Sequence, residues 1–372
     1  MSELFSCLRE VFWETLMELH LVKKDGFEKV VRFSEPSLQL EGIIAIHSTA
    51  LGPAVGGCRM WTYMNFDAAM NDALRLAEGM TYKAAISGLN WGGGKSVILE
   101  KPGTQKSKQL LEAYAHVVAE LGGSYITAKD VGIGAEDLAV IQSVTPHVLG
   151  IEGVSGSSGD PSPATAFGVF NGIQVAAQQQ FGSTNLQGRK IALQGLGSVA
   201  QSLLGHLLTA GAQITACDIS KAKSDEISRR YSVKIVSPNS IYEVACDIFS
   251  PCALGGVLNE QTIPVLKAKI IAGCANNQLH SDKDGLELHH RRILYAPDYV
   301  INAGGLINIY HENMIAGGYN RTRAFDHVRK IGPQLKEIFI RSEKENRAPH
   351  LVSNEIALNR VKLGRSSDSE DD

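Results

Sequence analysis

The sequence contains few cysteines, no long hydrophobic run and no excess of charge of either sign. Its six cysteines are scattered over 372 residues without a CxxC pair, so their spacing indicates neither a disulfide framework nor a zinc site, and we expect no metal. The longest apolar stretches are far shorter than the roughly 20 residues that a helix needs to span a bilayer. The formal net charge is only −3, which excludes the strong positive field that attracts nucleic acid or anionic lipid.

The N-terminal segment also lacks the features of an export signal. Residues 1–26 are acidic and amphipathic, and they contain no basic start followed by an apolar core. Together with the cysteine spacing and the charge, this predicts a cytoplasmic protein with no membrane partner and no nucleic-acid partner.

The length predicts two domains, because 372 residues exceed what one ordinary core organises. The segment 153–165, GVSGSSGDPSPAT, is dense in Gly, Ser and Pro and breaks both periodicities, which is typical of an inter-domain hinge. We therefore expect a first domain over 1–149 and a second over 150–344. We also expect 345–364 to pack back on the first domain and an acidic tail, 365–372, to be disordered.

A run of three glycines directly before a lysine raises the question of a phosphate-binding loop. The stretch GLNWGGGKSVI covers residues 88–98. A nucleotide P-loop needs a glycine, four residues and then Gly-Lys-Ser/Thr, so that successive backbone N–H groups surround the phosphates. Leu89 occupies the position of that first glycine, and Gly88 lies one residue too far back. The pattern argues against a P-loop, so Lys95 needs another role.

Two lysines of the N-terminal half lie at the ends of predicted elements. Apolar residues recur at helical spacing over 66–85, which predicts a long amphipathic helix that ends near Gly88. The residues SVIL, 96–99, predict a short buried strand. Lys83 is therefore expected near the helix end, and Lys95 just before the strand.

The region after the predicted boundary has the pattern of a dinucleotide-binding βαβ unit. Residues 189–218 predict an apolar strand, a glycine turn, a helix and a second strand that ends at an acid. In the turn, Gly195 permits the tight bend, Gly197 lets the backbone approach a pyrophosphate, and Ala200 allows close helix–strand packing. The alternative is an ordinary Gly-rich turn with a surface Asp. The expected cofactor-binding residues of this unit are Gly195, Gly197, Ser198, Val199 and Asp218.

Three more apolar segments follow this unit, with polar residues at their carboxyl ends. They cover 245–253, 269–277 and 293–305, and they predict further strands of the same sheet. An open parallel sheet presents its ligand site at the carboxyl ends of its strands, so a ligand is expected at that edge.

Eight runs of sequence carry the resemblance to a known family: LGPAVGGCRMWTY, DALRLAEGMTYK, GLNWGGGKSVI, ITAKDVG, LQGLGSVA, SPCALGGVLN, AGCANNQL and APDYVINAGG. In order and spacing, they resemble the Glu/Leu/Phe/Val amino-acid dehydrogenases over about residues 26–347. The resemblance implies an α/β enzyme with a cleft between a substrate and oligomerisation domain and a Rossmann-type domain. It also implies a homo-oligomer and reversible NAD-dependent oxidative deamination of an L-amino acid to its 2-oxo acid and ammonia.

Such a reaction can be served by two lysines and one carboxylate. The enzyme must hold an α-carboxylate, remove protons from an ammonium group and deliver water to an iminium carbon. The resemblance implies that Lys83 binds the carboxylate, Lys95 activates the water and Asp130 moves protons to and from the amine. Taken singly, each is more often a solvated lysine or a turn-capping acid. The positions that match family residues near the nicotinamide and the substrate are Thr165, Asn276, Asn277 and Asn302.

The resemblance also places apolar residues around the substrate side chain. Glutamate-specific relatives carry a lysine immediately before the Gly-Gly of the PxxGG segment, where this sequence has Val55 before Gly56 and Gly57. A buried glutamate carboxylate would find no partner there. We therefore expect a branched-chain substrate, leucine above valine, with phenylalanine, valine or tryptophan dehydrogenase activity as the alternative. The matching wall positions are Val55, Ala128, Leu306 and Ile309.

Some features depart from the family pattern. Trp91 stands where many members carry a smaller leucine, and Lys129 replaces an acid. The chain also ends before a basic segment that often helps subunits associate.

The rival function is a non-catalytic dinucleotide-binding sensor, which has no reason to keep the proton-transfer residues Lys83, Lys95 and Asp130. Asp218 predicts NAD in preference to NADP because a carboxylate there repels a 2′-phosphate, although Lys221 lies nearby.

Overall fold

The computed structural model describes residues 17–101, 105–151, 153, 156–313 and 318–368. The chain divides into two compact units: unit 1 comprises Met1–Gly159 with Asn359–Asp372, and unit 2 comprises Asp160–Leu358. The division lies inside the expected hinge 153–165, about ten residues after the boundary that we predicted. The end of that segment is helical, because helix α5 starts at Ser162.

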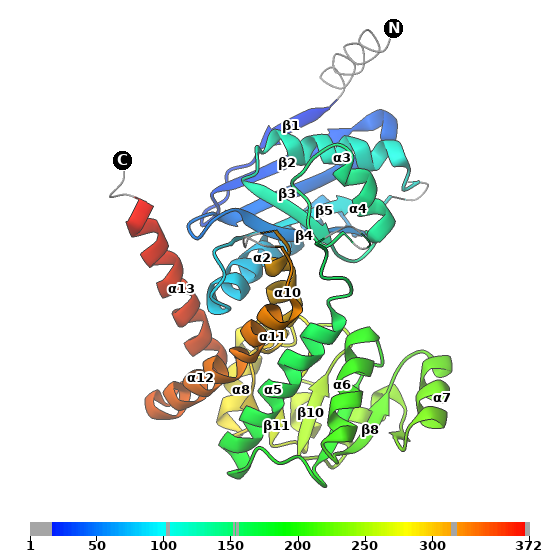
Figure 1. Ribbon diagram of the computed structural model, residues 1–372, viewed down its shortest axis with the longest axis vertical. Helices are drawn as coiled ribbons and strands as arrows, with labels where there is room; N and C mark the ends of the chain where they lie inside the picture. The colour runs from blue at the N-terminus through cyan, green and yellow to red at the C-terminus, as the bar shows by residue number, and fades with distance from the viewer. Residues whose placement is uncertain (1–16, 102–104, 152, 154–155, 314–317, 369–372) are drawn as a thin grey trace, which may run out of the picture. The chain divides into compact units, whose positions relative to one another are not determined.

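Unit 1 contains a mixed six-stranded sheet in the order β1-β2-β3-β5-β4-β6 (Figure 1). The strands β1, β2, β3 and β5 pair in antiparallel fashion, whereas β4 pairs in parallel with both β5 and β6. The bounds are Glu18–Leu21 (β1), Lys29–Glu35 (β2), Leu40–Ser48 (β3), Ala54–Trp61 (β4), Gly92–Leu99 (β5) and Tyr125–Lys129 (β6).

Helices cover both faces of this sheet. Ile43 packs in a core cluster with α2, and its neighbour Ile44 packs in a second cluster with α3 and α4. Because successive strand residues point to opposite faces, α2 covers one face and the α3–α4 pair covers the other. These helices, with the short 3₁₀ helix η1, have the bounds Phe66–Ile86 (α2), Lys108–Glu120 (α3), Ala135–Gln142 (α4) and Pro36–Leu38 (η1).

Helix α2 follows the predicted pattern closely. The side chain of Asn65 caps its first turn by accepting a hydrogen bond from Ala68 N at 2.8 Å. The apolar stripe that predicted the helix is buried at Ala69 and Ala73. The chain leaves the helix through Gly88, whose φ of +73° favours glycine. The predicted helix over 66–85 is confirmed.

Strand β5 is longer than we predicted. We expected a strand over 96–99, but β5 starts at Gly92, so Lys95 lies inside the strand and not before it. A Cβ on Gly92 would lie 1.9 Å from Ser48 O, and one on Gly93 would lie 2.0 Å from Thr81 N. Neighbouring backbone lies so close to these two positions that only glycine fits. This requirement outweighs the weak propensity of glycine for strands.

Unit 2 contains a parallel six-stranded sheet in the order β12-β11-β10-β7-β8-β9. This is the doubly wound order of a Rossmann fold, with the switch point between β7 and β10. Figure 1 shows α5 and α6 side by side along the sheet. The strand bounds are Lys190–Gln194 (β7), Gln213–Cys217 (β8), Lys234–Ile235 (β9), Ile248–Pro251 (β10), Ile270–Ile271 (β11) and Leu294–Tyr295 (β12).

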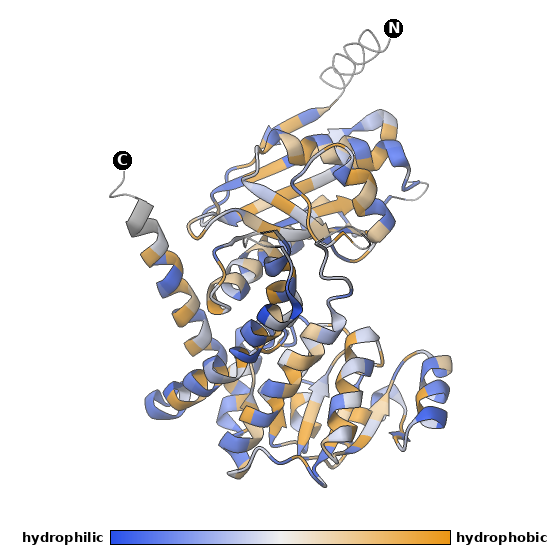
Figure 2. Cartoon of the chain, viewed as in Figure 1, coloured by the Kyte–Doolittle hydropathy of each residue, from blue (hydrophilic) through white to orange (hydrophobic). Residues whose placement is uncertain are grey.

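The helices of unit 2 follow the alternation of a doubly wound fold. Figure 2 shows hydrophobic residues concentrated on the strands and hydrophilic residues along α7. The helix bounds are Ser162–Phe181 (α5), Ser198–Thr209 (α6), Lys221–Arg230 (α7), Pro238–Glu243 (η2), Ile263–Val265 (η3), Asp282–His290 (α8), Asp298–Ile301 (α9), Gly304–Asn313 (α10), Arg321–Arg329 (α11), Ile331–Glu345 (α12) and Pro349–Asp368 (α13). The predicted α/β fold with a Rossmann-type second part is confirmed.

The prediction of a strand throughout 293–305 is wrong. Only Leu294–Tyr295 is extended, and the rest of this apolar segment forms α9 and the start of α10. A short apolar run does not distinguish a buried strand from a buried helix. The fixed φ of Pro297, directly before α9, favours a change of direction there.

The C-terminal helix α13 contributes to both units. Its first half belongs to unit 2, where the Tyr299 hydroxyl donates to Ser353 Oγ at 2.8 Å. In unit 1, Arg360 Nη1 donates to Ala85 O at 2.8 Å. The return to the first unit therefore begins at Asn359, later than the expected residue 345.

The expected disorder over 365–372 is contradicted in part. Helix α13 continues to Asp368, because extending a formed helix adds one hydrogen bond for each residue fixed. The last four positions, 369–372, lie outside the described residues. None of the helices in the described part of the chain is both long and apolar enough to cross a membrane.

Candidate functional site

The central feature of unit 1 is a buried ion pair between Lys95 and Asp130. Lys95 projects from β5 with a side chain that is only 7% exposed, and Asp130 follows directly after β6. Lys95 Nζ donates to Asp130 Oδ2. The strand between them, β4, contributes Gly57, where an added Cβ would lie 2.8 Å from Asp130 Cβ. Gly57 therefore leaves room for Asp130 to approach β4.

An arginine that we did not predict extends this pair. Arg59 Nε donates to Asp130 Oδ2 at 3.3 Å, and its Nη1 donates to Asp72 Oδ2 at 2.9 Å. The Tyr63 hydroxyl donates to the same Asp72 oxygen at 2.6 Å. Strand alternation could have found Arg59, because it lies two residues after Gly57 and thus on the same face of β4.

The charges in this network decide the protonation state of Asp130. Burial raises the pKa of Asp130, but the neighbouring cations Lys95 and Arg59 outweigh burial and hold this pKa below its ordinary value. Burial lowers the pKa of Arg59, and the carboxylates of Asp130 and Asp72 more than compensate for it. The network therefore keeps an ionised carboxylate beside a buried lysine.

Lys83, the second predicted lysine, lies in the last turn of α2 and is half-buried. Helix α2 touches β5 where Thr81 meets Gly93. These two residues precede Lys83 and Lys95 by two positions each, so the contact brings the two lysine-bearing segments together in unit 1.

The predicted side-chain pocket residues are distributed over both units. In unit 1, Val55 on β4 is buried and Ala128 on β6 is half-buried, and β4 pairs directly with β6. Gly56, the next residue of β4, pairs with Thr127 of β6. An added Cβ on Gly56 would lie 1.7 Å from Gly94 O. In unit 2, Leu306 and Ile309 are half-buried and lie three residues apart on α10, hence on one helix face.

The glycine turn of unit 2 has the geometry that the motif predicts. Gly195 adopts a φ of +97°, which favours glycine, and an added Cβ would lie 2.9 Å from Ala253 Cβ. A Cβ on Gly197 would meet no atom within 4 Å, so open space lies beside the backbone that starts α6. Ser198 at the helix start is exposed and Val199 is half-buried.

Asp218 stabilises this turn directly. It follows β8, and its Oδ2 accepts a hydrogen bond from Leu196 N at 2.7 Å. Its Oδ1 accepts another from Ser220 N at 2.8 Å. The acid therefore lies at the turn and connects the carboxyl ends of β7 and β8.

Two of the predicted polar residues, Asn276 after β11 and Asn302 after β12, are in contact in unit 2. Asn302 is buried, and its Nδ2 donates to Asn276 Oδ1 at 2.8 Å. Within the described residues, Asn302 Oδ1 is buried without a hydrogen-bond partner. Asn277 follows with a φ of +51°. Thr165 lies on α5, where its Oγ1 would be 2.7 Å from a Cβ on Gly305, so α5 and α10 approach closely here.

The two departures from the family pattern lie in different environments. Trp91 is completely buried directly before β5, whereas Lys129 is exposed as the last residue of β6. In the part of the chain that the structure describes, no group of three or more His, Cys, Asp or Glu could hold a metal ion.

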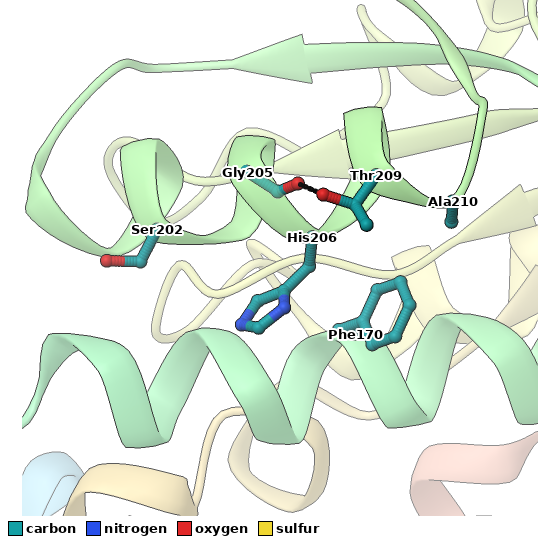
Figure 3. Close-up of a pocket in the computed structure, with 6 residues that line it drawn as sticks. All are labelled: Phe170, Ser202, Gly205, His206, Thr209 and Ala210. Atoms are coloured by element: carbon teal, nitrogen blue, oxygen red, sulfur yellow. Dashed lines mark hydrogen bonds between the residues drawn. The ribbon is translucent and has the colours of Figure 1, made fainter.

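A separate hollow of about 410 Å³ lies between α5 and α6 (Figure 3). The rings of Phe170 and His206 stack there at 5.2 Å, and Thr209 donates to Gly205 O at 2.9 Å. None of the predicted site residues lines this hollow, so it is distinct from the candidate site.

Comparisons with known proteins match both parts of the chain. Residues 29–147 match the model of the Glu/Leu/Phe/Val dehydrogenase dimerisation domain, and residues 218–362 match the Glutamate/Leucine/Phenylalanine/Valine dehydrogenase model. A leucine dehydrogenase from Geobacillus stearothermophilus is 46% identical over 343 residues, which cover 92% of this chain and 93% of that protein. A leucine dehydrogenase from Bacillus cereus is 45% identical, covering 95% and 96%.

A solved structure is similar over almost the whole chain. The crystal structure of L-tryptophan dehydrogenase from Nostoc punctiforme has a TM-score of 0.78 and 40% identity, and the match covers 97% of this chain and 99% of that one. The family resemblance predicted from the motifs is thus confirmed. The chain belongs to the Glu/Leu/Phe/Val dehydrogenase family and is an amino-acid dehydrogenase.

Proposed function

We propose that the protein catalyses the reversible oxidative deamination of a branched-chain L-amino acid, leucine above all, to its 2-oxo acid and ammonia, with NAD as the cofactor. The observation that carries this proposal is the buried Lys95–Asp130 pair in unit 1. The leucine dehydrogenases with 45–46% identity support leucine as the substrate.

The described residues can divide the proton and charge work of this reaction among them. Lys83, a half-buried cation at the end of α2, binds the α-carboxylate of the substrate. Asp130 is ionised and accepts a proton from the substrate ammonium. Asp130, whose side chain is 20% exposed, then releases that proton to solvent and accepts one from Lys95 through their hydrogen bond. The neutral Lys95 amine can in turn accept a proton from the water that attacks the iminium carbon.

The residues of unit 2 fit a dinucleotide. Open space beside Gly197 at the start of α6 suits a pyrophosphate, because backbone N–H groups at a helix start attract anions. Asn302 Oδ1, buried and without a hydrogen-bond partner among the described residues, suits a donor of the nicotinamide amide, and Asn276 lies beside it. Thr165 on α5, close to Gly305, is the other residue that we assign to the nicotinamide. Gly195, Ser198 and Val199 complete the turn. When bound, NAD supplies the hydride acceptor.

Asp218 supports NAD in preference to NADP. Its carboxylate lies at the glycine turn, where it can bond a free ribose hydroxyl and repel a 2′-phosphate. Lys221, which the sequence places nearby, pairs with Asp225 at 2.7 Å on the exposed surface of α7.

In each unit, the predicted side-chain positions are apolar and at least half-buried: Val55 and Ala128 in unit 1, and Leu306 and Ile309 in unit 2. They support a branched-chain substrate side chain, and Asn277 is the polar residue that we propose beside the substrate. Apolar surroundings of this kind leave a glutamate carboxylate without a partner, which costs several kcal/mol of hydration. A difference of one methylene changes the fit by only about 1–3 kcal/mol, so we expect a graded preference for leucine over valine.

The test is the initial rate of NADH or NADPH formation with a panel of L-amino acids under one set of conditions. We expect the highest kcat/KM with leucine and NAD, lower values with isoleucine and valine, and rejection of glutamate. Tryptophan or phenylalanine as the best substrate would replace the branched-chain proposal, in keeping with the similar L-tryptophan dehydrogenase. Glutamate as best substrate would refute the pocket argument, and no oxidation at all would favour a sensor.

We also propose a cytoplasmic homo-oligomer. The match of residues 29–147 to a dimerisation domain supports self-association. The edge strand β1 also exposes Leu21, at 77%, and Leu19, at 43%, and an exposed apolar strand edge can pair with another chain.

A further inference from the structure

Asp130 has two cationic partners on the same oxygen. Lys95 on β5 and Arg59 on β4 both donate to Oδ2. Lys95 has a place in the proposed chemistry, but Arg59 has none so far. Only 24% of its side chain is exposed, so its contacts are not those of a solvated surface arginine.

The guanidinium of Arg59 is held in one orientation from its far side. Nη1 donates to Asp72 on α2 at 2.9 Å, and Tyr63 fixes that carboxylate with a 2.6 Å hydrogen bond. A planar guanidinium with two partners on different elements has little freedom to rotate. The chain from Tyr63 to Asp130 thus connects α2 to the residue that follows β6.

We infer that Arg59 is a positioning residue for Asp130: it holds the carboxylate against Lys95 in the orientation that proton transfer requires, and Asp72 with Tyr63 holds Arg59. This inference rests on the proposed function. Proton transfer needs hydrogen-bond reach, and a misplacement of about 1 Å can cost on the order of 100-fold in rate. Arg59 therefore contributes to turnover without touching substrate.

The charges around Asp130 predict the direction of a pH effect. With Arg59 removed, burial is opposed by one cation only, so the pKa of Asp130 rises. Burial raises the pKa of Cys58 on β4 to about 11, so this thiol stays neutral near pH 7. The titratable and charged groups that face Asp130, directly or through Arg59, are Lys95, Arg59, Cys58, Tyr125, Asp72 and Tyr63.

The experiment compares three arginine variants of the full chain. Arg59→Met removes the charge and both hydrogen bonds, and Arg59→Lys keeps the charge but cannot bridge two carboxylates. Arg75→Met is the matched control, because Arg75 also contacts Asp72, at 3.6 Å, but is largely exposed and makes its ion pair on the opposite carboxylate oxygen. For each variant, kcat and KM for the best amino acid are measured across pH, and the crystal structure is determined.

We expect Arg59→Met to lower kcat about 10- to 100-fold and to move the acid limb of the pH profile to higher pH. Arg59→Lys should restore much of the pH profile but not the full kcat, and Arg75→Met should match the wild type. In the crystal structure of Arg59→Met, the Asp130 carboxylate should leave its position against Lys95.

An unchanged kcat and pH profile in Arg59→Met would overturn the inference, as would an Asp130–Lys95 pair that is unchanged in its crystal structure. These results differ from failure of the proposed function, in which the wild type oxidises no L-amino acid. In that case the crystal structure of Arg59→Met still decides whether Arg59 holds Asp130. If Arg59→Met does not fold, the Arg59→Lys variant provides the same comparison.

Discussion

Lys95 is the residue on which the proposed mechanism depends most. It lies within β5, buried, with Asp130 as its partner. We predict that Lys95→Ala folds, binds NADH and turns over at least ~100-fold more slowly, because general acid–base catalysis usually contributes that much. Stopped-flow or steady-state kcat measurements, with NADH binding followed by fluorescence, check this.

Lys101→Ala is the matched control for Lys95→Ala. Lys101 is also an ion-paired lysine near β5, but its partner is Glu41, at 2.7 Å, and half of its side chain is exposed. Its loss should leave kcat close to that of the wild type. A near-normal kcat in Lys95→Ala would instead assign the glycine-rich lysine a purely structural role.

At the residue level, the sequence predicted the ion pair's members but not their surroundings. Lys95 and Asp130 stood out through motifs, whereas Arg59 and Asp72 are ordinary charged residues in the sequence. Their importance comes from contacts between residues 71 and 13 positions apart, on different strands and a helix. Strand alternation could place Arg59 on the face of Gly57, but nothing in the sequence indicates that it pairs with Asp130 and Asp72, so the folded chain is needed to reveal these contacts.

At the level of elements, the glycines of β5 explain how a lysine can be buried in a strand. Gly93 lies against α2 so closely that a Cβ would be 2.0 Å from Thr81 N, a backbone atom that cannot move aside cheaply. We predict that Gly93→Ala lowers the free energy of unfolding by about 1–3 kcal/mol through overpacking. Urea unfolding followed by circular dichroism measures this change.

Gly79 provides the opposite case on the helix that Gly93 touches. It lies inside α2, and an added Cβ would meet no atom within 4 Å. Gly79→Ala should therefore raise the free energy of unfolding by roughly 0.5–1 kcal/mol, since alanine loses less backbone entropy in a helix. Equal effects of the two substitutions would show that the tight contact at β5 relaxes without cost.

The elements differ in how well periodicity predicted them. Helix α2 was clear because its apolar stripe is long and amphipathic. The segment 293–305 was misassigned because α9 and the start of α10 are buried in an almost continuous apolar run. The glycines before Lys95 suggested a loop, since strand formation there depends on backbone contacts with other elements.

At the scale of the whole molecule, the two units carry different parts of the proposed chemistry. Unit 1 supplies a network of charged side chains around Lys95 and Asp130. Unit 2 supplies a glycine turn, a helix start and the asparagines that follow β11 and β12. Acid should affect the stability of unit 2 in particular, because it contains three histidines whose pKa lies below the ordinary value.

These histidines are His206, His311 and His350. Burial lowers the pKa of each, and for His311 it acts together with the nearby cations Arg323 and Lys330 and with His327, giving a pKa of about 4 against an ordinary 6.5. The unfolded chain therefore binds more protons than the folded chain below about pH 6.5. The contribution of these histidines to the stability of unit 2 is fully present above that pH and, for His311, is lost as the pH falls toward 4.

The last prediction follows from this difference in proton binding. The melting temperature of the wild type should fall between pH 7 and pH 5, and His311→Gln should show a smaller fall, because glutamine can still bond His327, which lies 3.1 Å from His311 Nε2, but does not titrate. The exposed His280, replaced by glutamine, is the control and should follow the wild type. Scanning calorimetry at several pH values measures all three proteins. Parallel pH dependences in the wild type and His311→Gln would mean that acid acts on the fold through other groups.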